Sequence, residues 1–186
     1  MSEHDPRQEH LAYDLNKVLS SVVGLKTLIP DDAFTASLLG TERSGNGVVI
    51  REDGLVLTIG YLVTEAETIW ITDNRGRAVS GTVLGYDQET GFGLVQALGP
   101  LDLPAMELGD SSAVREGDAV VLAGHGGRRS TVKAQVIGVR EFAGYWEYLI
   151  DEAIFTAPAH SNWGGSAMIG ADGRLLGIGS LFIQQS

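Results

Sequence analysis

The sequence has no cysteine, few basic residues and no long apolar run, and each shortage excludes a class of protein. Without cysteine there is no disulfide framework, no cysteine-ligated zinc site and no thiol nucleophile. Only 13 Lys and Arg residues stand against 24 Asp and Glu, a net charge of -11, which argues against a nucleic-acid partner because phosphates require a basic surface. No apolar run reaches the roughly 18 residues of a membrane span, so no span is expected.

The N-terminal segment is polar and then amphipathic. Residues 1–10 have neither a basic region nor an apolar stretch of the secretory type, so the expected location is the cytoplasm, or the periplasm if a leader has been removed. Apolar residues then recur at helical spacing and predict a short amphipathic helix: Leu11, Leu15, Val18, Leu19 and Val22. The simpler expectation is that this helix packs on its own domain; the alternative is a homo-oligomer contact with a second copy.

From about residue 21 the pattern is β. The chain has 25 glycines, which separate short β-branched runs, and Asp-Gly pairs supply turn residues. The predicted strands are Val22–Leu28, Val48–Ile50, Leu55–Ile59, Thr68–Thr72, Ala78–Leu84, Gly93–Ala97, Ala119–Ala123, Thr131–Val139, Tyr145–Ile150, Ala167–Ile169 and Leu175–Leu181. Many short strands indicate a sandwich or barrel. We expect a tail and helix over 1–20, one β half over 21–98, a linker over 99–112 and a second β half over 113–186.

An internal similarity favours two halves. Residues 45–60 (GNGVVIREDGLVLTIG) align with residues 164–179 (GGSAMIGADGRLLGIG), with seven identities in 16 positions. Each segment is predicted to form a strand, an Asp-Gly turn and a second strand. One such hairpin in each half is what a double β-barrel would contain, although any hairpin with an Asp-Gly turn has similar residues.

Four sequence blocks carry a family resemblance. They are GNGVVIREDGLVLTIGYLV (45–63), YDQETGFGLVQ (86–96), LGDSSAVREGDAVVLAGHG (108–126) and SNWGGSAMIGADGRLLGIG (161–179). In order and spacing they resemble the trypsin-like serine protease domain of the HtrA (Deg) type. The resemblance implies an all-β fold of two antiparallel six-stranded β-barrels, preceded here by the short helix, with the active cleft between the barrels.

The same resemblance points to three positions where the family's catalytic residues are absent. Tyr61 stands in the place of the histidine base, Gly91 in that of the aspartate and Trp163 in that of the serine nucleophile. A phenol with an ordinary pKa of about 10 accepts a proton poorly at neutral pH. Glycine has no carboxylate, and the indole has no nucleophilic atom. The sequence therefore predicts a catalytically inactive protease homologue.

Such a homologue would act by binding a protein or peptide. The loop Asn162, Trp163, Gly164 and Gly165 is the expected remnant of the oxyanion site, where backbone N–H groups could bind an anion or a terminal carboxylate. We also expect the rings of Tyr61 and Trp163 to pack across the former cleft, with centroids about 4.5 to 7 Å apart. The simpler interpretation is that such a pair fills the core. The functional alternative is that the pair forms a docking site for a peptide that binds by strand addition.

Two further possibilities stay open at this point. The first is a serine endopeptidase with a relocated active site, for which Ser161 and Ser166 are candidate nucleophiles and His125 and His160 candidate bases. The second is a metal site at His125 and His160, although the chain has no H-x-H or H-x-x-x-H spacing. Neither is needed for a binding protein, and no cofactor is expected.

Overall fold

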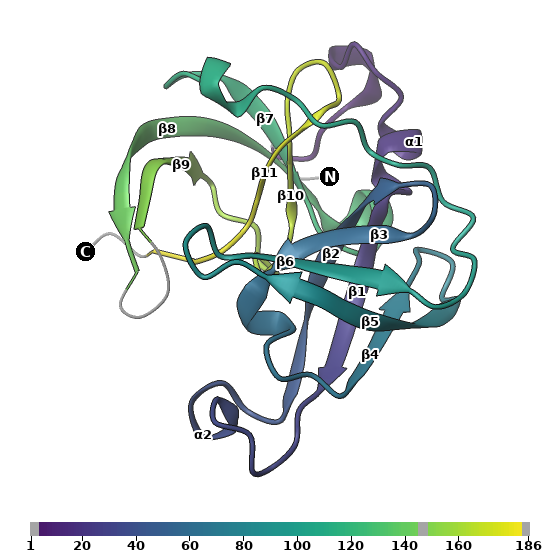
Figure 1. Cartoon of the computed structure of the whole chain (residues 1–186). Helices are drawn as coiled ribbons and strands as arrows, with labels where there is room; N and C mark the ends of the chain where they lie inside the picture. The colour runs from purple at the N-terminus through teal and green to yellow at the C-terminus, as the bar shows by residue number, and fades with distance from the viewer. Residues whose placement is uncertain (1–3, 145–148, 184–186) are drawn as a thin grey trace.

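The computed structural model describes residues 4–144 and 149–183. The fold is predominantly β, as predicted, and the helices are short (Figure 1). The strands are β1 (Val22–Leu28), β2 (Glu42–Arg51), β3 (Leu55–Ile59), β4 (Thr68–Thr72), β5 (Ala78–Tyr86), β6 (Phe92–Ala97), β7 (Ala119–Ala123), β8 (Thr131–Ala143), β9 (Leu149–Ala157), β10 (Ala167–Ile169) and β11 (Leu175–Ile178). The helical elements are α1 (Leu15–Leu19), α2 (Ala36–Leu39), η1 (Gln8–His10), η2 (Gly60–Leu62), η3 (Ser111–Ala113) and η4 (Gly127–Ser130). No helix in the described ranges is long and apolar enough to cross a bilayer.

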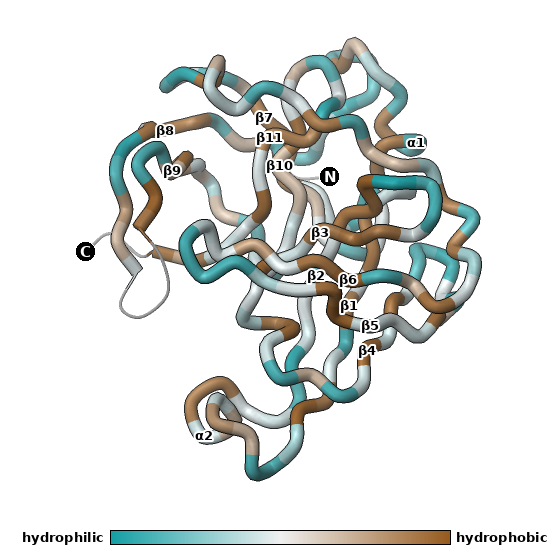
Figure 2. Tube along the Cα trace, in the orientation of Figure 1, coloured by the Kyte–Doolittle hydropathy of each residue, from teal (hydrophilic) through white to brown (hydrophobic). Residues whose placement is uncertain are grey.

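The first half is a closed antiparallel barrel with the strand order β1-β2-β3-β6-β5-β4. Its core is formed by the inward-facing residues of all six strands, among them the fully buried Val23, Val56, Ile71 and Val95. Alternation along each strand places these residues inside and polar residues outside. In Figure 2 the barrel strands contain hydrophobic segments, and hydrophilic stretches lie in loops that connect them. The prediction of a six-stranded barrel in the N-terminal half is confirmed.

The second half differs from the prediction of another six-stranded barrel. Over the described residues it is a curled five-stranded sheet in the order β11-β10-β7-β8-β9, and β9 and β11 are its two edges. The predicted strand Leu175–Leu181 is shorter than expected, because residues 179–183 continue without strand pairing. A sheet closes only when its edges meet, so this half remains open.

A shared core joins the two halves to the N-terminal helix. It contains Val48 from β2, Val121 from β7 and Ile169 from β10, and the apolar side of α1 packs onto it through Leu15 and Leu19. The helix covers less of the chain than its apolar spacing predicts, because β1 already begins at Val22. The expectation that the helix packs on its own domain is confirmed, and a homo-oligomer contact through it stays a prediction.

Two other sequence expectations need correction. The internal similarity does mark two Asp-Gly hairpins, β2–β3 and β10–β11, but they hold different places in the strand orders of the two halves. The similarity therefore reflects hairpin chemistry and not equivalent places in the two halves. The predicted strand Tyr145–Ile150 is displaced to Leu149–Ala157, and residues 145–148 lie outside the described ranges.

Candidate functional site

Tyr61 lies in η2, directly after β3, in the connection from β3 to β4 of the first barrel. Its hydroxyl donates a 2.8 Å hydrogen bond to the carbonyl oxygen of Ser180. Its own carbonyl oxygen accepts a 2.8 Å bond from Nη1 of Arg43, whose side chain is buried. Burial lowers the pKa of the Arg43 guanidinium, and the nearby Glu65 carboxylate raises it in part. Tyr61 thus anchors a turn and joins the two halves.

Gly91 ends the turn between β5 and β6, and its backbone is in the left-handed region with φ of 80°. Its N–H donates to the carbonyl oxygen of Asp87, and its carbonyl oxygen accepts a 2.7 Å bond from the N–H of Gly60. Gly60 immediately precedes Tyr61 in η2. The Gly91 and Tyr61 positions are therefore neighbours, as the resemblance implies. A side chain at Gly91 would require a strained backbone.

Trp163 follows β9 in a loop, and its ring is partly exposed. Its ring stacks on Phe182, with centroids 5.5 Å apart and planes 29° from parallel. Among the described rings, then, the stacking partner of Trp163 is Phe182 and not Tyr61, so the expected Tyr61–Trp163 pair is wrong. The Tyr61 hydroxyl lies instead beside the neighbouring glycine: a Cβ added to Gly164 would come within 2.8 Å of it.

Three of the N–H groups around the loop 162–165 have partners within the protein. The N–H of Asn162 donates to Nδ1 of His160, that of Gly165 to the carbonyl oxygen of Gly179, and that of Ser166 to the carbonyl oxygen of Trp163. Anion binding by this loop stays a prediction, and it would have to rely on other N–H groups.

The same loop is tied to the first barrel by the fully buried Asn46. Its Nδ2 donates to the carbonyl oxygens of Asn162 (2.9 Å) and Gly164 (3.0 Å), and its Oδ1 accepts from the N–H of His125 (2.7 Å). A Cβ on Gly165, whose φ is 74°, would collide with the Asn46 carbonyl oxygen. The close approach of the two halves requires glycine there.

The two candidate histidines have separate partners. His160 is buried; its Nδ1 accepts from Asn162, so the proton of this neutral ring is on Nε2, which donates to the Ser130 carbonyl oxygen at 2.9 Å. Nε2 of His125 donates to the carbonyl oxygen of Asp73 at 2.9 Å. Neither ring is arranged as a base for Ser161 or Ser166. Within the described residues no group of three His, Asp or Glu could hold a metal ion.

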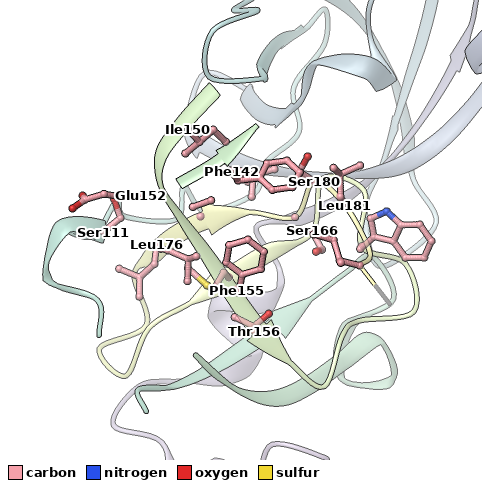
Figure 3. A pocket seen from close by; sticks show the side chains of 18 of the residues that line it. Ser111, Phe142, Ile150, Glu152, Phe155, Thr156, Ser166, Leu176, Ser180 and Leu181 are labelled. Carbon is pink, nitrogen blue, oxygen red and sulfur yellow. The ribbon is translucent and has the colours of Figure 1, made fainter. Parts of the chain in front are cut away.

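A groove of about 570 Å³ is lined by β9, by Trp163 and by residues 176–183, which include the end of β11 and the chain that follows it. Its lining is mostly apolar, and Figure 3 shows Phe155 of β9 and Leu176 of β11 at the same hollow, with Ser180 and Leu181 farther along it. Trp163 and Phe182, which stack on each other, are both among its lining residues. Because Ser180 accepts the bond from Tyr61, this wall of the groove is connected to the first barrel.

Comparison with known proteins agrees with this architecture. Residues 45–178 match the family described as Trypsin-like peptidase domain. The chain belongs to this family. Serine protease HTR4 of Bos taurus is 29% identical over 184 residues, which cover 92% of this chain and 36% of that protein. Periplasmic serine endoprotease DegP of Escherichia coli (strain K12) is 29% identical over 142 residues, covering 75% and 30%. The chain thus spans about a third of the length of these curated relatives.

Solved structures show the same fold. The HtrA-type protease AlgW with tripeptide is 25% identical, with a TM-score of 0.69 over 88% of this chain and 52% of that one. The same protease with decapeptide is 19% identical, with a TM-score of 0.69 over 93% and 60%. The HtrA-type, trypsin-like resemblance is confirmed for the fold.

Sequence reasoning about this trypsin-like peptidase domain missed the groove and Phe182. The sequence feature that could have indicated them is the apolar run Leu181-Phe182-Ile183. The predicted last strand includes Leu181, and no role is predicted for the other two residues. All three side chains are about half exposed, and all three line the groove. An exposed apolar run beside an open sheet edge is the kind of surface that binds a partner.

Proposed function

We propose that this trypsin-like peptidase domain is not a peptidase and acts by binding an extended protein or peptide segment in the groove beside Trp163. The observation that carries the proposal is the hydrogen bond from the Tyr61 hydroxyl to Ser180. At the position of the family's proton acceptor, this chain has a donor that is already bound to a backbone carbonyl. Acyl transfer through a serine requires an acceptor at that place.

The other two positions support the same conclusion. Gly91 supplies no carboxylate. Trp163 places an indole where the nucleophile would stand. A relocated serine endopeptidase is the alternative, but the ring nitrogen of His160 that carries the proton donates to a carbonyl oxygen, so this ring is not the base of a Ser-His pair.

The binding half of the proposal rests on the groove. The Trp163–Phe182 stack adds a partly exposed aromatic surface to its lining, and aromatic rings of this kind dominate the energetics of many interfaces. The solved HtrA-type protease AlgW was obtained with a tripeptide and with a decapeptide, which favours a peptide as the ligand class for this fold.

Hydrolysis is tested by incubating the purified chain with casein, with fluorogenic peptides and with a fluorophosphonate probe. We expect no cleavage and no labelling. Labelling of any serine, or cleavage that copurifies with the chain, would contradict the first half of the proposal.

Binding is tested with fluorescein-labelled, carboxamidomethylated lysozyme, a basic polypeptide that stays unfolded. Trp163→Ala should weaken binding about tenfold or more, because a buried aromatic anchor contributes about 2 kcal/mol. Trp70→Ala is the matched control, since Trp70 is equally exposed but lies on β4 of the first barrel. Equal affinity in the two variants, or no binding by the unaltered chain, contradicts the second half.

A further inference from the structure

Three segments that are distant in the sequence carry a concentration of basic residues in this acidic chain. They are residues 14–20, which contain α1, residues 73–77, the turn between β4 and β5, and residues 127–130, which form η4. Together they contain five of the 13 basic residues and only two of the 24 acidic ones. We call the surface that they form the basic patch. Its basic residues are Lys17, Arg75, Arg77, Arg128 and Arg129.

Hydrogen bonds hold the three segments of the basic patch together. Nδ2 of Asn74 donates to the carbonyl oxygen of Leu19 at 2.9 Å, and Oδ1 of Asn74 accepts from the N–H of Gly126 at 2.8 Å. Asn74 thus joins its turn both to the end of α1 and to the chain that leads into η4. The third connection is a 2.7 Å bond from Nε of Arg128 to Oδ1 of Asn16 in α1. The cations therefore share one surface.

Most of the cations in the basic patch are free. Arg77 pairs with the carboxylates of Asp73 (3.4 Å) and Asp102 (3.0 Å). The other four cations are exposed and form no ion pair with a carboxylate of residues 4–144 or 149–183. Elsewhere in the first barrel, by contrast, Lys26 and Arg51 each have a carboxylate partner. The free charges of the patch are available to a ligand.

The two acidic residues of these segments do not neutralise the patch. The side chain of Asp73 is 4% exposed, and its Oδ1 accepts from the N–H groups of Arg75 and Arg77. Asp14 precedes α1, and its Oδ1 accepts from the N–H of Lys17. Four free cationic groups thus stand against one exposed carboxylate. The surface is positive in a chain whose net charge is -11.

We propose that the basic patch binds a short acidic segment of another polypeptide. A guanidinium group donates two parallel N–H groups to one carboxylate, so carboxylates are strong ligands for a surface rich in arginine. The bond from Arg128 to Asn16 uses Nε, and both Nη groups can donate to such a ligand. Because this side chain is already held in place, less conformational entropy is lost on binding. None of the three segments lines the groove, so the two surfaces are separate.

The charge of the rest of the chain favours a short segment over a long polyanion. A nucleic acid or an anionic bilayer extends past the patch and meets the surface that carries most of the 24 acidic residues. Salt screens charges that lie more than about 8 Å apart at physiological ionic strength, so a short segment interacts mainly with the patch. A second copy of the chain would bring its own net charge of -11. An acidic segment of a different protein is the best-matched occupant.

The experiment uses the full chain and two blocked octapeptides, measured by isothermal titration calorimetry. The first peptide alternates glutamate with serine, and the second has glutamine in place of each glutamate. The glutamate peptide should bind about tenfold or more tightly than the glutamine peptide, because it can form several ion pairs. Raising the salt from about 50 mM to about 500 mM should remove most of this difference, since the pairs are exposed.

Charge reversal locates the site. Arg75→Glu and Arg129→Glu should each weaken binding of the glutamate peptide by about fivefold, because each replaces an attractive charge with a repulsive one. Arg115→Glu is the matched control: Arg115 is equally exposed but precedes β7, whereas η4 follows it, and binding should change less than about twofold. Amide hydrogen exchange should slow in residues 14–20, 73–77 and 125–130 when the glutamate peptide is added.

Two outcomes overturn the site. The first is equal binding of the glutamate and glutamine peptides, and the second is equal affinity of Arg129→Glu and Arg115→Glu for the glutamate peptide. Trp163→Ala should bind the glutamate peptide as the unaltered chain does, and a loss there would assign the acidic peptide to the groove and contradict the basic patch. Failure of the basic patch leaves the proposed function intact, because unfolded lysozyme tests the groove by itself.

The choice of occupant is tested with a deoxythymidine oligonucleotide and with phosphatidylglycerol vesicles. We expect both to bind more weakly than the glutamate peptide at physiological salt. Tighter binding of either probe that Arg75→Glu removes would assign the patch to a nucleic acid or a membrane and overturn the acidic segment. A dimer in sedimentation velocity that Arg129→Glu dissociates would assign the patch to a second copy and overturn it as well.

Discussion

The hydroxyl of Tyr61 donates a 2.8 Å hydrogen bond to the carbonyl oxygen of Ser180, and this bond connects the first barrel to the wall of the groove. Tyr61→Phe keeps the ring and removes only the donor. We expect a loss of about 1 kcal/mol in the free energy of unfolding, because the hydrogen bond between the phenol and the Ser180 carbonyl oxygen is lost. Urea denaturation measures it. Tyr86→Phe, on the exposed side of β5, is the control and should be neutral; equal stability of both variants would contradict the structural role of the bond.

Gly91 should resist replacement because of its backbone. With φ at 80°, Gly91→Ala is expected to cost about 1 to 2 kcal/mol of unfolding free energy, since a Cβ is strained in the left-handed region. Gly85→Ala is a matched control on β5: a Cβ there meets no atom within 4 Å, and the change should stay within about 0.5 kcal/mol. Thermal or urea unfolding measures the loss of stability in both variants. A neutral Gly91→Ala would show that the turn rearranges freely.

Asn46 is expected to be the most sensitive polar residue between the halves. Asn46→Ala removes the partners of the Asn162 carbonyl oxygen and of the His125 N–H, whereas the Gly164 carbonyl oxygen keeps its 2.8 Å bond from the backbone N–H of residue 46. Each unsatisfied buried group costs about 1 to 3 kcal/mol, so we expect a loss of about 2 kcal/mol or more. The exposed Gln88→Ala should leave stability unchanged. A loss under about 1 kcal/mol for Asn46→Ala would mean that water replaces the side chain.

The strands of the first barrel were the most predictable part of the fold. Val22–Leu28, Leu55–Ile59 and Thr68–Thr72 have the predicted bounds, because glycine, proline or polar residues stand within two positions of each end. Register within a barrel then follows from which alternate residues are buried. The second half was less predictable: whether its edges meet depends on pairing between distant segments, and no local pattern at Leu149–Ala157 or Leu175–Ile178 encodes it.

The positions of the candidate site stay a prediction from the sequence, and their contacts could not be predicted. The sequence blocks located Tyr61, Gly91 and Trp163, and the structure places Tyr61 beside both Gly60–Gly91 and Gly164. The partner of Trp163 was mispredicted because Phe182 lies in a segment without strand pairing, whose path depends on tertiary packing. The hydrogen bond between His160 and the Ser130 carbonyl oxygen could not be predicted either, because the two residues are distant in the sequence.

Asp73 should make stability depend on pH in the acid range. Burial raises the pKa of this carboxyl, but the N–H groups of Arg77 and Arg75 and the charges of both arginines outweigh it, so the pKa is lowered overall. A lowered folded pKa stabilises the protein above the unfolded value of about 3.9, and this contribution disappears as the pH falls through the folded pKa.

Asp73→Asn should therefore be less stable than the unaltered chain at pH 7, and the difference should shrink as the pH falls from about 5 to about 2. Urea denaturation at several pH values measures it. Asp31→Asn, an exposed carboxylate on the loop between β1 and β2, is the control and should reproduce the pH dependence of the unaltered chain. A difference between Asp73→Asn and the unaltered chain that stays constant down to pH 2 would assign the effect of the substitution to packing and not to the charge of the carboxylate.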